Sequence, residues 1–503
     1  MPHATQMTTD LSRTATASPM PPLLLAALGA ALLAGCTSMA PVQEPVSLPV
    51  PQAWPAHLQA GTQGAAAASL AWRDYFTDPV LRQLIATALE HNRDLRVAAL
   101  RAEEARAAFQ IQRSELFPAI GVGGQAARAR VPGDLNLSGR SVVSGEYRAE
   151  VGFSSWELDL WGRVRSLKDA ALQTWLASDA GRHAVQTALI AQVADGYLGL
   201  RELDERVAIA RETLATRQES FRIFTRREAV GASSRLQLAQ VQTLLTQAQA
   251  LLAQLELARA QQLHALAQLV GAHPGPLPAA APFDDALVLA ELRPGLPSEL
   301  LAARPDIAAA EHQLRAARAQ IGAARAAFFP RIALTARWGT ASAELDGLFD
   351  GGSRAWAFVP TVSLPIFDGG RRRANLELGE IRSDMAVAQY EKAIQTAFRE
   401  VADGLAARRW LSEQITVQRT AVQAQAERAR LAQLRYDNGS AAYLEVLDAQ
   451  RDLLAARQQL VQARRALLSS QVGLYAALGG GSGAEPAALP ATLPAMPADP
   501  PNS

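Results

Sequence analysis

The chain has 503 residues, a formal net charge of +1, and 49% hydrophobic but only 6% aromatic residues. This charge balance gives no indication of a nucleic-acid partner, which normally requires a strongly basic domain or stripe. One cysteine cannot form an intrachain disulfide, the seven histidines lack His-x-x-x-His spacing, and no P-loop or Gly-x-Ser-x-Gly sequence occurs, so we expect no metal site, no cofactor and no catalytic activity.

Residues 1–35 are predicted to be a lipoprotein signal peptide. The apolar stretch Pro21–Gly35 is too short to span a bilayer as a helix, and it leads directly into Leu-Ala-Gly-Cys at Cys36. This sequence resembles the lipobox of bacterial lipoproteins, which implies that the Cys36 thiol is the lipidation site. Thr37, rather than an aspartate, follows the cysteine, and in such lipoproteins this implies sorting to the outer membrane. The alternative is a short buried helix that ends in an inert thiol.

The sequence does not fix which methionine begins the signal peptide. The segment before its apolar core is long and carries only Arg13 and Asp10, whereas a compact basic segment is usual. Met1, Met7 and Met20 are therefore alternative starts.

Two tandem copies of one unit fill most of the mature chain, and we assign them to residues 72–271 and 299–479. Asp306 follows Asp94 by 306 − 94 = 212 residues, and Gly439 follows Gly231 by 439 − 231 = 208 residues, with other matches at the same two offsets. The remaining segments are predicted to be an extended N-terminal segment, a connector and a disordered tail, at residues 36–71, 272–298 and 480–503.

A proline ends the first helix of each unit. The helix predicted at about Val80–Leu116 stops at Pro118, and its counterpart stops at Pro330, because proline cannot donate a backbone hydrogen bond and restricts the residue before it. Apolar residues then alternate with small or polar ones, which predicts hairpins at residues 119–160 and 331–367.

Such alternation over about ten residues is typical of outer-membrane barrel strands, although a half-buried soluble hairpin gives the same pattern. Four strands per chain leave open edges that lipid cannot satisfy. A membrane-spanning structure therefore needs several chains in one closed barrel.

A very long helix follows each hairpin. Residues Arg163–Ala229 and Arg371–Asp437 each form a proline-free run of 67 residues (229 − 163 + 1 and 437 − 371 + 1), which as a helix is ~100 Å long. A turn at Gly231 or Gly439 comes next, where glycine tolerates left-handed backbone angles, and a shorter helix completes the unit. No compact domain accommodates such helices, so we expect a tube of antiparallel helices.

These features together resemble the TolC family of outer-membrane efflux proteins, in particular its NodT-like lipoprotein branch. The resemblance covers about Trp72–Gly479 and is carried by ELLAARPDIAAAEHQLRAARAQIGAARAAFFPRIAL, WELDLWGRVR, PIFDGGRRRAN, EVADGLAARR and YDNGSAAYLEVLDAQRDLL. It implies a mainly α fold with a β-barrel contribution, in which a homotrimer forms a 12-stranded barrel in outer-membrane lipid and a periplasmic α-helical tunnel.

The resemblance also implies the function. Family members are passive exit ducts for small molecules or drugs, which an inner-membrane resistance-nodulation-division (RND) pump delivers through a periplasmic adaptor. The alternative transport role is the outer-membrane duct of a type I secretion system that exports peptides or proteins. A periplasmic coiled-coil scaffold is a further class, but it does not explain four amphipathic strands bounded by prolines.

An acidic stripe follows the second turn. Glu445, Asp448 and Asp452 have i, i+3, i+7 spacing and share one helix face, where like charges need water, a cation or a basic partner. The positions 208 residues earlier are neutral in all three cases, being Gln237, Gln240 and Leu244. The stripe therefore belongs to one repeat only.

By resemblance, Glu445 and Asp448 lie where the family places acidic rings at the periplasmic tunnel entrance. Leu444 lies at the position of an apolar constriction, and Tyr436 at that of a tip tyrosine that locks the closed state. Ala441 replaces an arginine found in some members, so the gate is not expected to depend on that ion pair. We hypothesise a narrow gate that favours cations; the alternative is a merely solvated stripe.

Overall fold

The computed structural model describes residues 39–41, 65–273, 275, 287–288, 292–293 and 297–481. The predicted signal peptide, Cys36 and residues 482–503 of the predicted tail lie outside the described residues. None of the helices in these ranges combines the length and the apolar composition that crossing a membrane requires. The described residues divide into two compact units: residues 39–41, 111–169 and 318–380 form the first, and the described parts of 65–110, 170–317 and 381–481 form the second.

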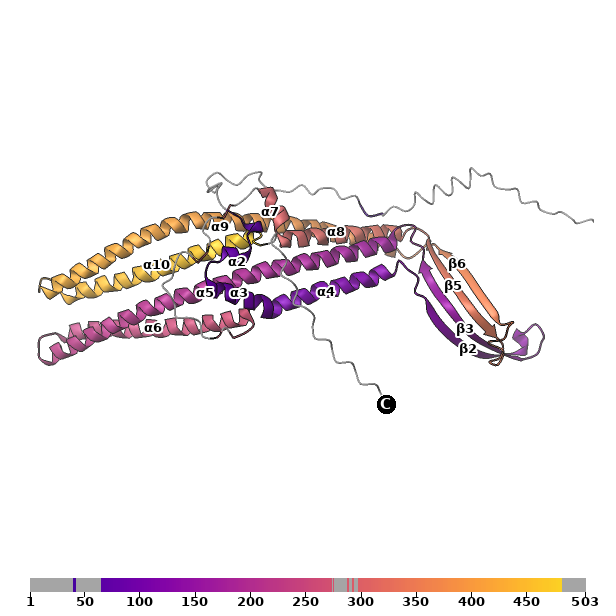
Figure 1. Cartoon of the computed structure of the whole chain (residues 1–503), viewed down its shortest axis with the longest axis horizontal. Helices are drawn as coiled ribbons and strands as arrows, with labels where there is room; N and C mark the ends of the chain where they lie inside the picture. The colour runs from indigo at the N-terminus through magenta and orange to yellow at the C-terminus, as the bar shows by residue number, and fades with distance from the viewer. Residues whose placement is uncertain are drawn as a thin grey trace, which may run out of the picture. The chain divides into compact units, whose positions relative to one another are not determined.

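The first unit contains a four-stranded antiparallel sheet (Figure 1). In spatial order its strands are β2 (Gly121–Val131), β3 (Val142–Glu157), β5 (Arg331–Ser342) and β6 (Arg354–Ser363). The β2–β3 and β5–β6 pairs are the two expected hairpins, and the β3–β5 pair joins the two repeats. The last strand ends at Ser363, whereas the second hairpin was predicted to extend to residue 367.

Two glycines permit the close approach of β3 and β5. A Cβ atom on Gly152 would lie 2.1 Å from the carbonyl oxygen of Ala336, and one on Gly339 would lie 2.0 Å from that of Ala149. Any side chain at these positions would push the strands apart. The contact between the repeats within the sheet therefore depends on glycine at both places.

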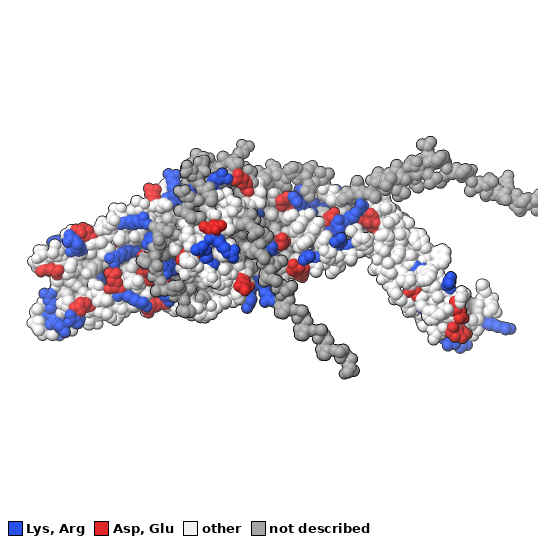
Figure 2. All heavy atoms as spheres, in the orientation of Figure 1, with Lys and Arg blue, Asp and Glu red and all other residues white. Residues whose placement is uncertain are grey.

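The outer strand β6 exposes all of its residues. Trp356, Phe358 and Val362 share one face of this strand and are 77%, 56% and 66% exposed. Figure 2 shows mostly uncharged atoms over the strands, whereas acidic and basic side chains are interspersed over the helices. An apolar sheet face of this kind needs a covering of lipid or protein.

Long helices make up most of the described chain. The helices of the first repeat, short and long, are α2 (Trp72–Tyr75), α3 (Pro79–His91), α4 (Arg93–Ser114), α5 (Arg163–Ala229) and α6 (Arg235–Val270). Those of the second are α7 (Pro297–Ala303), α8 (Pro305–Ala326), α9 (Arg371–Asp437) and α10 (Tyr443–Ala477). Both 67-residue helices have the limits that the sequence predicts.

The helix predicted at Val80–Leu116 is wrong as a single element, because it is broken at Asn92 into α3 and α4. Asn92 has an extended backbone, and its side-chain oxygen accepts a hydrogen bond from Leu95 N at 2.9 Å while its amide donates to Leu269 O at 2.8 Å. The side chain thus caps α4 and satisfies a carbonyl in the last turn of α6.

Parts of the predicted extended segment and connector have regular structure. Strand β1 (Ala65–Ala66) pairs in parallel with β4 (Leu292–Arg293). Next to it lies the core of the second unit, where the rings of Tyr75 and Tyr475 stack at 4.2 Å. The Tyr75 hydroxyl donates to Gln471 O at 2.9 Å, so the buried phenol has a polar partner.

Candidate functional site at the helical hairpin tips

The two predicted turns have the same backbone structure. Gly231 and Gly439 adopt φ values of 74° and 72°. After α5, Ala232 N donates to Arg227 O at 2.7 Å, and after α9, Ser440 N donates to Arg435 O at 2.8 Å. These bonds, together with those of the glycine N–H groups, form Schellman motifs, which explains why both helices end at glycine.

Aromatic side chains join the α5–α6 hairpin to the α9–α10 hairpin. The ring of Tyr443, on α10, lies 4.4 Å from that of Phe224, on α5, and 4.8 Å from that of Tyr436, on α9. Tyr443 is buried, and its hydroxyl donates to Ser220 Oγ at 2.7 Å. Burial raises the pKa of Tyr443, so this hydroxyl stays protonated and available as a donor.

A polar contact between the hairpins lies beside this cluster. Arg227, on α5, donates from Nη1 to the hydroxyl of Tyr436, and its guanidinium carbon lies 5.9 Å from the centre of that ring. Tyr436 is one of the predicted gate residues, whereas Arg227 is not. The available signal was the repeat, because Arg227 and Arg435 are equivalent positions (435 − 227 = 208), each in the last turn before its glycine.

Each carboxylate of the predicted acidic stripe has an arginine partner in the same chain. Glu445 lies 2.6 Å from Arg435, Asp448 lies 3.3 Å from Arg451, and Asp452 lies 2.7 Å from Arg428 and 3.3 Å from Arg451. The hydrogen bond from Arg428 is the main cause of the lowered pKa of Asp452. The stripe is therefore compensated within the chain.

The predicted constriction residue and the two predicted helix-ending prolines also lie within the described residues. Leu444 is 48% exposed at the start of α10, next to Glu445. Pro330 directly precedes β5, and its carbonyl accepts a hydrogen bond from Trp161 Nε1 at 2.8 Å; Pro118 lies between α4 and β2. Within the described ranges, no group of three or more His, Cys, Asp or Glu side chains is placed to hold a metal ion.

The family model described as "Outer membrane efflux protein" matches residues 84–272 and 296–480. The chain belongs to this family. Its two matched segments start 296 − 84 = 212 residues apart and end 480 − 272 = 208 residues apart, which are the two offsets of the internal repeat. The resemblance to TolC-family channels is thereby confirmed.

Relatives of this outer membrane efflux protein agree over almost their full length. The toluene efflux pump outer membrane protein TtgF of Pseudomonas putida is 47% identical over 459 residues, which cover 89% of this chain and 95% of the relative. A membrane protein from Pseudomonas aeruginosa, with 42% identity and a TM-score of 0.83, covers 88% of this chain and 98% of that structure. The structure of the open state of the MtrE outer membrane channel of Neisseria gonorrhoeae has 38% identity and a TM-score of 0.80. The match covers 89% of this chain and 99% of that structure.

These findings establish the fold class of helical tunnel and barrel, the outer-membrane location and the role in efflux. The family is one of transport ducts, and no catalytic activity is indicated for it.

Proposed function

We propose that three copies of this chain form the exit duct of a tripartite efflux system. The observation that carries this proposal is the open sheet of the first unit. β2 and β6 are its outer strands, and neither has a second partner strand among the described residues. Unpaired edges are not tolerated in lipid, and three four-stranded sheets supply 12 strands for a closed barrel.

The remaining partners follow from this assembly. An inner-membrane RND pump delivers the substrate, and a periplasmic adaptor joins the pump to the helical hairpins. Cys36 carries the lipid anchor. The name of TtgF links that relative to toluene, so small apolar molecules are the proposed substrates here, in preference to the peptides of a type I secretion system.

We also propose that the hairpin tips are the periplasmic gate. The cluster of Phe224, Tyr436 and Tyr443 and the bond from Arg227 hold the two hairpins together, which favours a closed entrance. Leu444, Glu445, Asp448 and Asp452 line that entrance. Because three arginines compensate the three carboxylates, we expect their preference for cations to be weak.

A deletion strain tests the proposed function. Loss of the gene should increase susceptibility to small apolar toxicants such as toluene. The full-length gene should fully restore resistance, whereas the Cys36→Ser variant at the same expression level should not. The purified protein should be a trimer in detergent and conduct ions in a planar bilayer. A monomer without conductance, or unchanged susceptibility of the deletion strain together with loss of secreted peptides, would contradict the proposal.

A further inference from the structure

A buried arginine without an acidic partner lies two helical turns before Phe224 of the aromatic cluster. Arg217, on α5, is only 3% exposed. Within the described residues it has one hydrogen bond, from Nη1 to the neutral Gln450 Oε1 at 2.8 Å, and no carboxylate partner. A guanidinium has five N–H donors and a permanent charge, so this partner satisfies only a small part of its bonding capacity.

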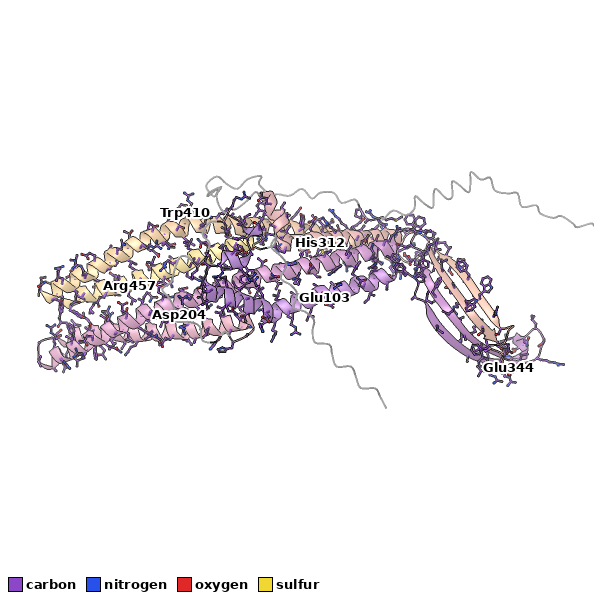
Figure 3. All side chains as sticks on the ribbon, viewed as in Figure 1. Glu103, Asp204, His312, Glu344, Trp410 and Arg457 are labelled. Carbon is purple, nitrogen blue, oxygen red and sulfur yellow. The ribbon has the colours of Figure 1, made fainter. Side chains whose placement is uncertain are left out.

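Arg217 lines a pocket of about 320 Å³. The pocket lies among α5, α9 and α10, and its basic side chains are Arg217, Arg430 and Arg457 (Arg457 is labelled in Figure 3). Glu212 is the acidic residue that lines it. The lining thus contains three guanidinium groups and one carboxylate.

The carboxylates nearby are engaged by the other two arginines. Glu212 lies 3.3 Å from Arg457, and its side chain is 68% exposed. Arg430 binds Glu427 through two hydrogen bonds of 2.9 and 2.8 Å. The charge of Arg217 is therefore left without a counter-ion, and burial lowers the pKa of this arginine, as expected of a cation that has lost hydration.

Apolar side chains complete the pocket wall. They are Ile209, Ala426, Ala429, Leu453 and Leu454. An arginine fork binds the paired oxygens of a carboxylate, phosphate or sulfate in a bidentate manner, and such bonds are stronger than bonds to a neutral amide or water. A bound oxyanion would give Arg217 the partner that the chain itself does not provide.

We propose that this pocket is a binding site for a small oxyanion, held by Arg217 and completed by Arg457 and Arg430. Since α5 belongs to the first repeat, and α9 and α10 to the second, the anion joins the two hairpins. Inorganic phosphate or sulfate is the expected occupant, because a tetrahedral anion presents acceptors to guanidinium groups on three different helices. The site is independent of whether the protein acts as an exit duct.

Calorimetric titration of the purified full-length protein in detergent tests this site. Sodium phosphate, sulfate and acetate are titrated separately. Sodium chloride keeps the ionic strength equal in the three titrations, so that charge screening is the same in each. Wild type is expected to bind phosphate or sulfate saturably and more tightly than acetate. Arg217→Gln should weaken that affinity at least tenfold, and Arg217→Lys, which keeps the charge but loses the fork, should weaken it less.

Arg226→Gln is the matched control, because Arg226 is an exposed arginine on the same helix and does not line the pocket. It should bind like wild type. If Arg217→Gln does not fold, Arg457→Gln and a selenate-soaked crystal replace it, with an anomalous peak expected beside Arg217. The proposal is overturned if no anion binds saturably, if Arg217→Gln or Arg457→Gln binds as wild type does, or if selenate is absent from the pocket. Tighter binding of acetate would reassign the site to carboxylates.

Discussion

The two hairpin turns share one backbone but differ in their polar contacts. At the first turn, Gln237 and Ser234 form a reciprocal capping box, so Arg227 is left to bond Tyr436 of the other hairpin. At the second turn the N-cap is Ala442, which has no capping side chain, and Glu445, the counterpart of Gln237, pairs with Arg435 instead. A duplicated fold has thus acquired an asymmetric contact in which one repeat reaches the other.

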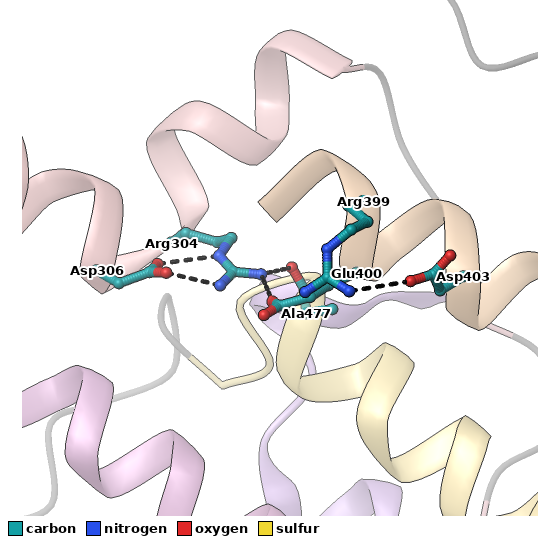
Figure 4. Close-up of polar contacts among 6 residues, drawn as sticks. All are labelled: Arg304, Asp306, Arg399, Glu400, Asp403 and Ala477. Atoms are coloured by element: carbon teal, nitrogen blue, oxygen red, sulfur yellow. Dashed lines mark hydrogen bonds and ion pairs between the residues drawn. The ribbon is translucent and has the colours of Figure 1, made fainter. Parts of the chain in front are cut away.

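The junctions between α3 and α4 and between α7 and α8 show the same kind of difference. Asn92 donates to Leu269 O, and its counterpart Arg304 (304 − 92 = 212) donates to Ala477 O at 3.0 Å. Arg304 is 8% exposed and also binds Asp306 and Glu400 (Figure 4). Burial alone would lower the pKa of Arg304, but these two carboxylates raise it. The second junction is therefore ionic, and the first is neutral.

Breaking the ionic junction is expected to have the largest effect on stability. Arg304→Met leaves two carboxylates and the Ala477 carbonyl without their donor, which costs about 3–5 kcal/mol for a fully buried pair. The Asp306 and Glu400 side chains are 39% and 38% exposed, so solvent reduces this to about 2–3 kcal/mol. Asn92→Ala, the matched change in the first repeat, should cost less, about 1–2 kcal/mol, because it removes a cap and the neutral hydrogen bond to the Leu269 carbonyl. Urea unfolding followed by circular dichroism checks both, and equal losses would contradict the ionic difference.

Sequence patterns predict the parts of this fold that depend on local backbone chemistry. The proline-free run of α5, the glycine at 231 and the prolines at 118 and 330 each act on their own segment, so helix limits and turns follow directly. The break at Asn92 was missed because a lone asparagine does not stand out in a helical pattern. Its counterpart is followed by Pro305 at the start of α8, so the 212-residue offset already contained the signal.

The candidate gate is less predictable, because its contacts depend on packing between helices and not on local backbone chemistry. Spacing alone places Glu445, Asp448 and Asp452 on one face of α10, but it does not show which arginines approach them. The Arg227–Tyr436 contact depends on how α5 packs against α9, and no local pattern encodes that packing. The close β3–β5 approach at Gly152 is likewise a property of two strands far apart in sequence.

The turn glycines test whether the two backbones are equivalent. A Cβ on Gly231 or Gly439 would meet no atom within 4 Å, so only the left-handed φ opposes a side chain there. Gly231→Ala and Gly439→Ala should each lower the free energy of unfolding by about 1–2 kcal/mol, and the two losses should be nearly equal. Urea unfolding measures this, with Gly181→Ala in mid-helix α5 as a control that should not destabilise. Clearly unequal losses in the free energy of unfolding would show that side-chain contacts, and not the left-handed backbone alone, determine the cost of a side chain at the two turns.

The contact between the hairpins is expected to affect gating more than stability. Tyr436→Phe removes the hydroxyl that accepts from Arg227 but retains the ring, so the closed state should lose about 0.5–1.5 kcal/mol, or roughly 2- to 10-fold in the closed-to-open ratio. Single-channel recording should show more frequent opening, and Arg227→Gln should do the same. Arg435→Gln, the equivalent change in the other repeat, should have a smaller effect because Arg435 bonds within its own hairpin. Equal effects of the two arginine variants would exclude an asymmetric lock.

The smallest effect is expected at the acidic stripe, where the two repeats differ most in formal charge. Asp448→Ala removes one carboxylate but leaves Arg451 paired with Asp452, so the local charge becomes more positive by one per chain. If the residue lines a narrow entrance, cation preference measured as a reversal potential under a salt gradient should fall, but by less than about twofold in permeability ratio, because neighbouring arginines already compensate the stripe. Gln240→Ala, at the equivalent position of the first repeat, is the neutral control. An unchanged reversal potential in Asp448→Ala would place the stripe on a merely solvated surface, and the constriction would then depend on Leu444 and the aromatic cluster alone.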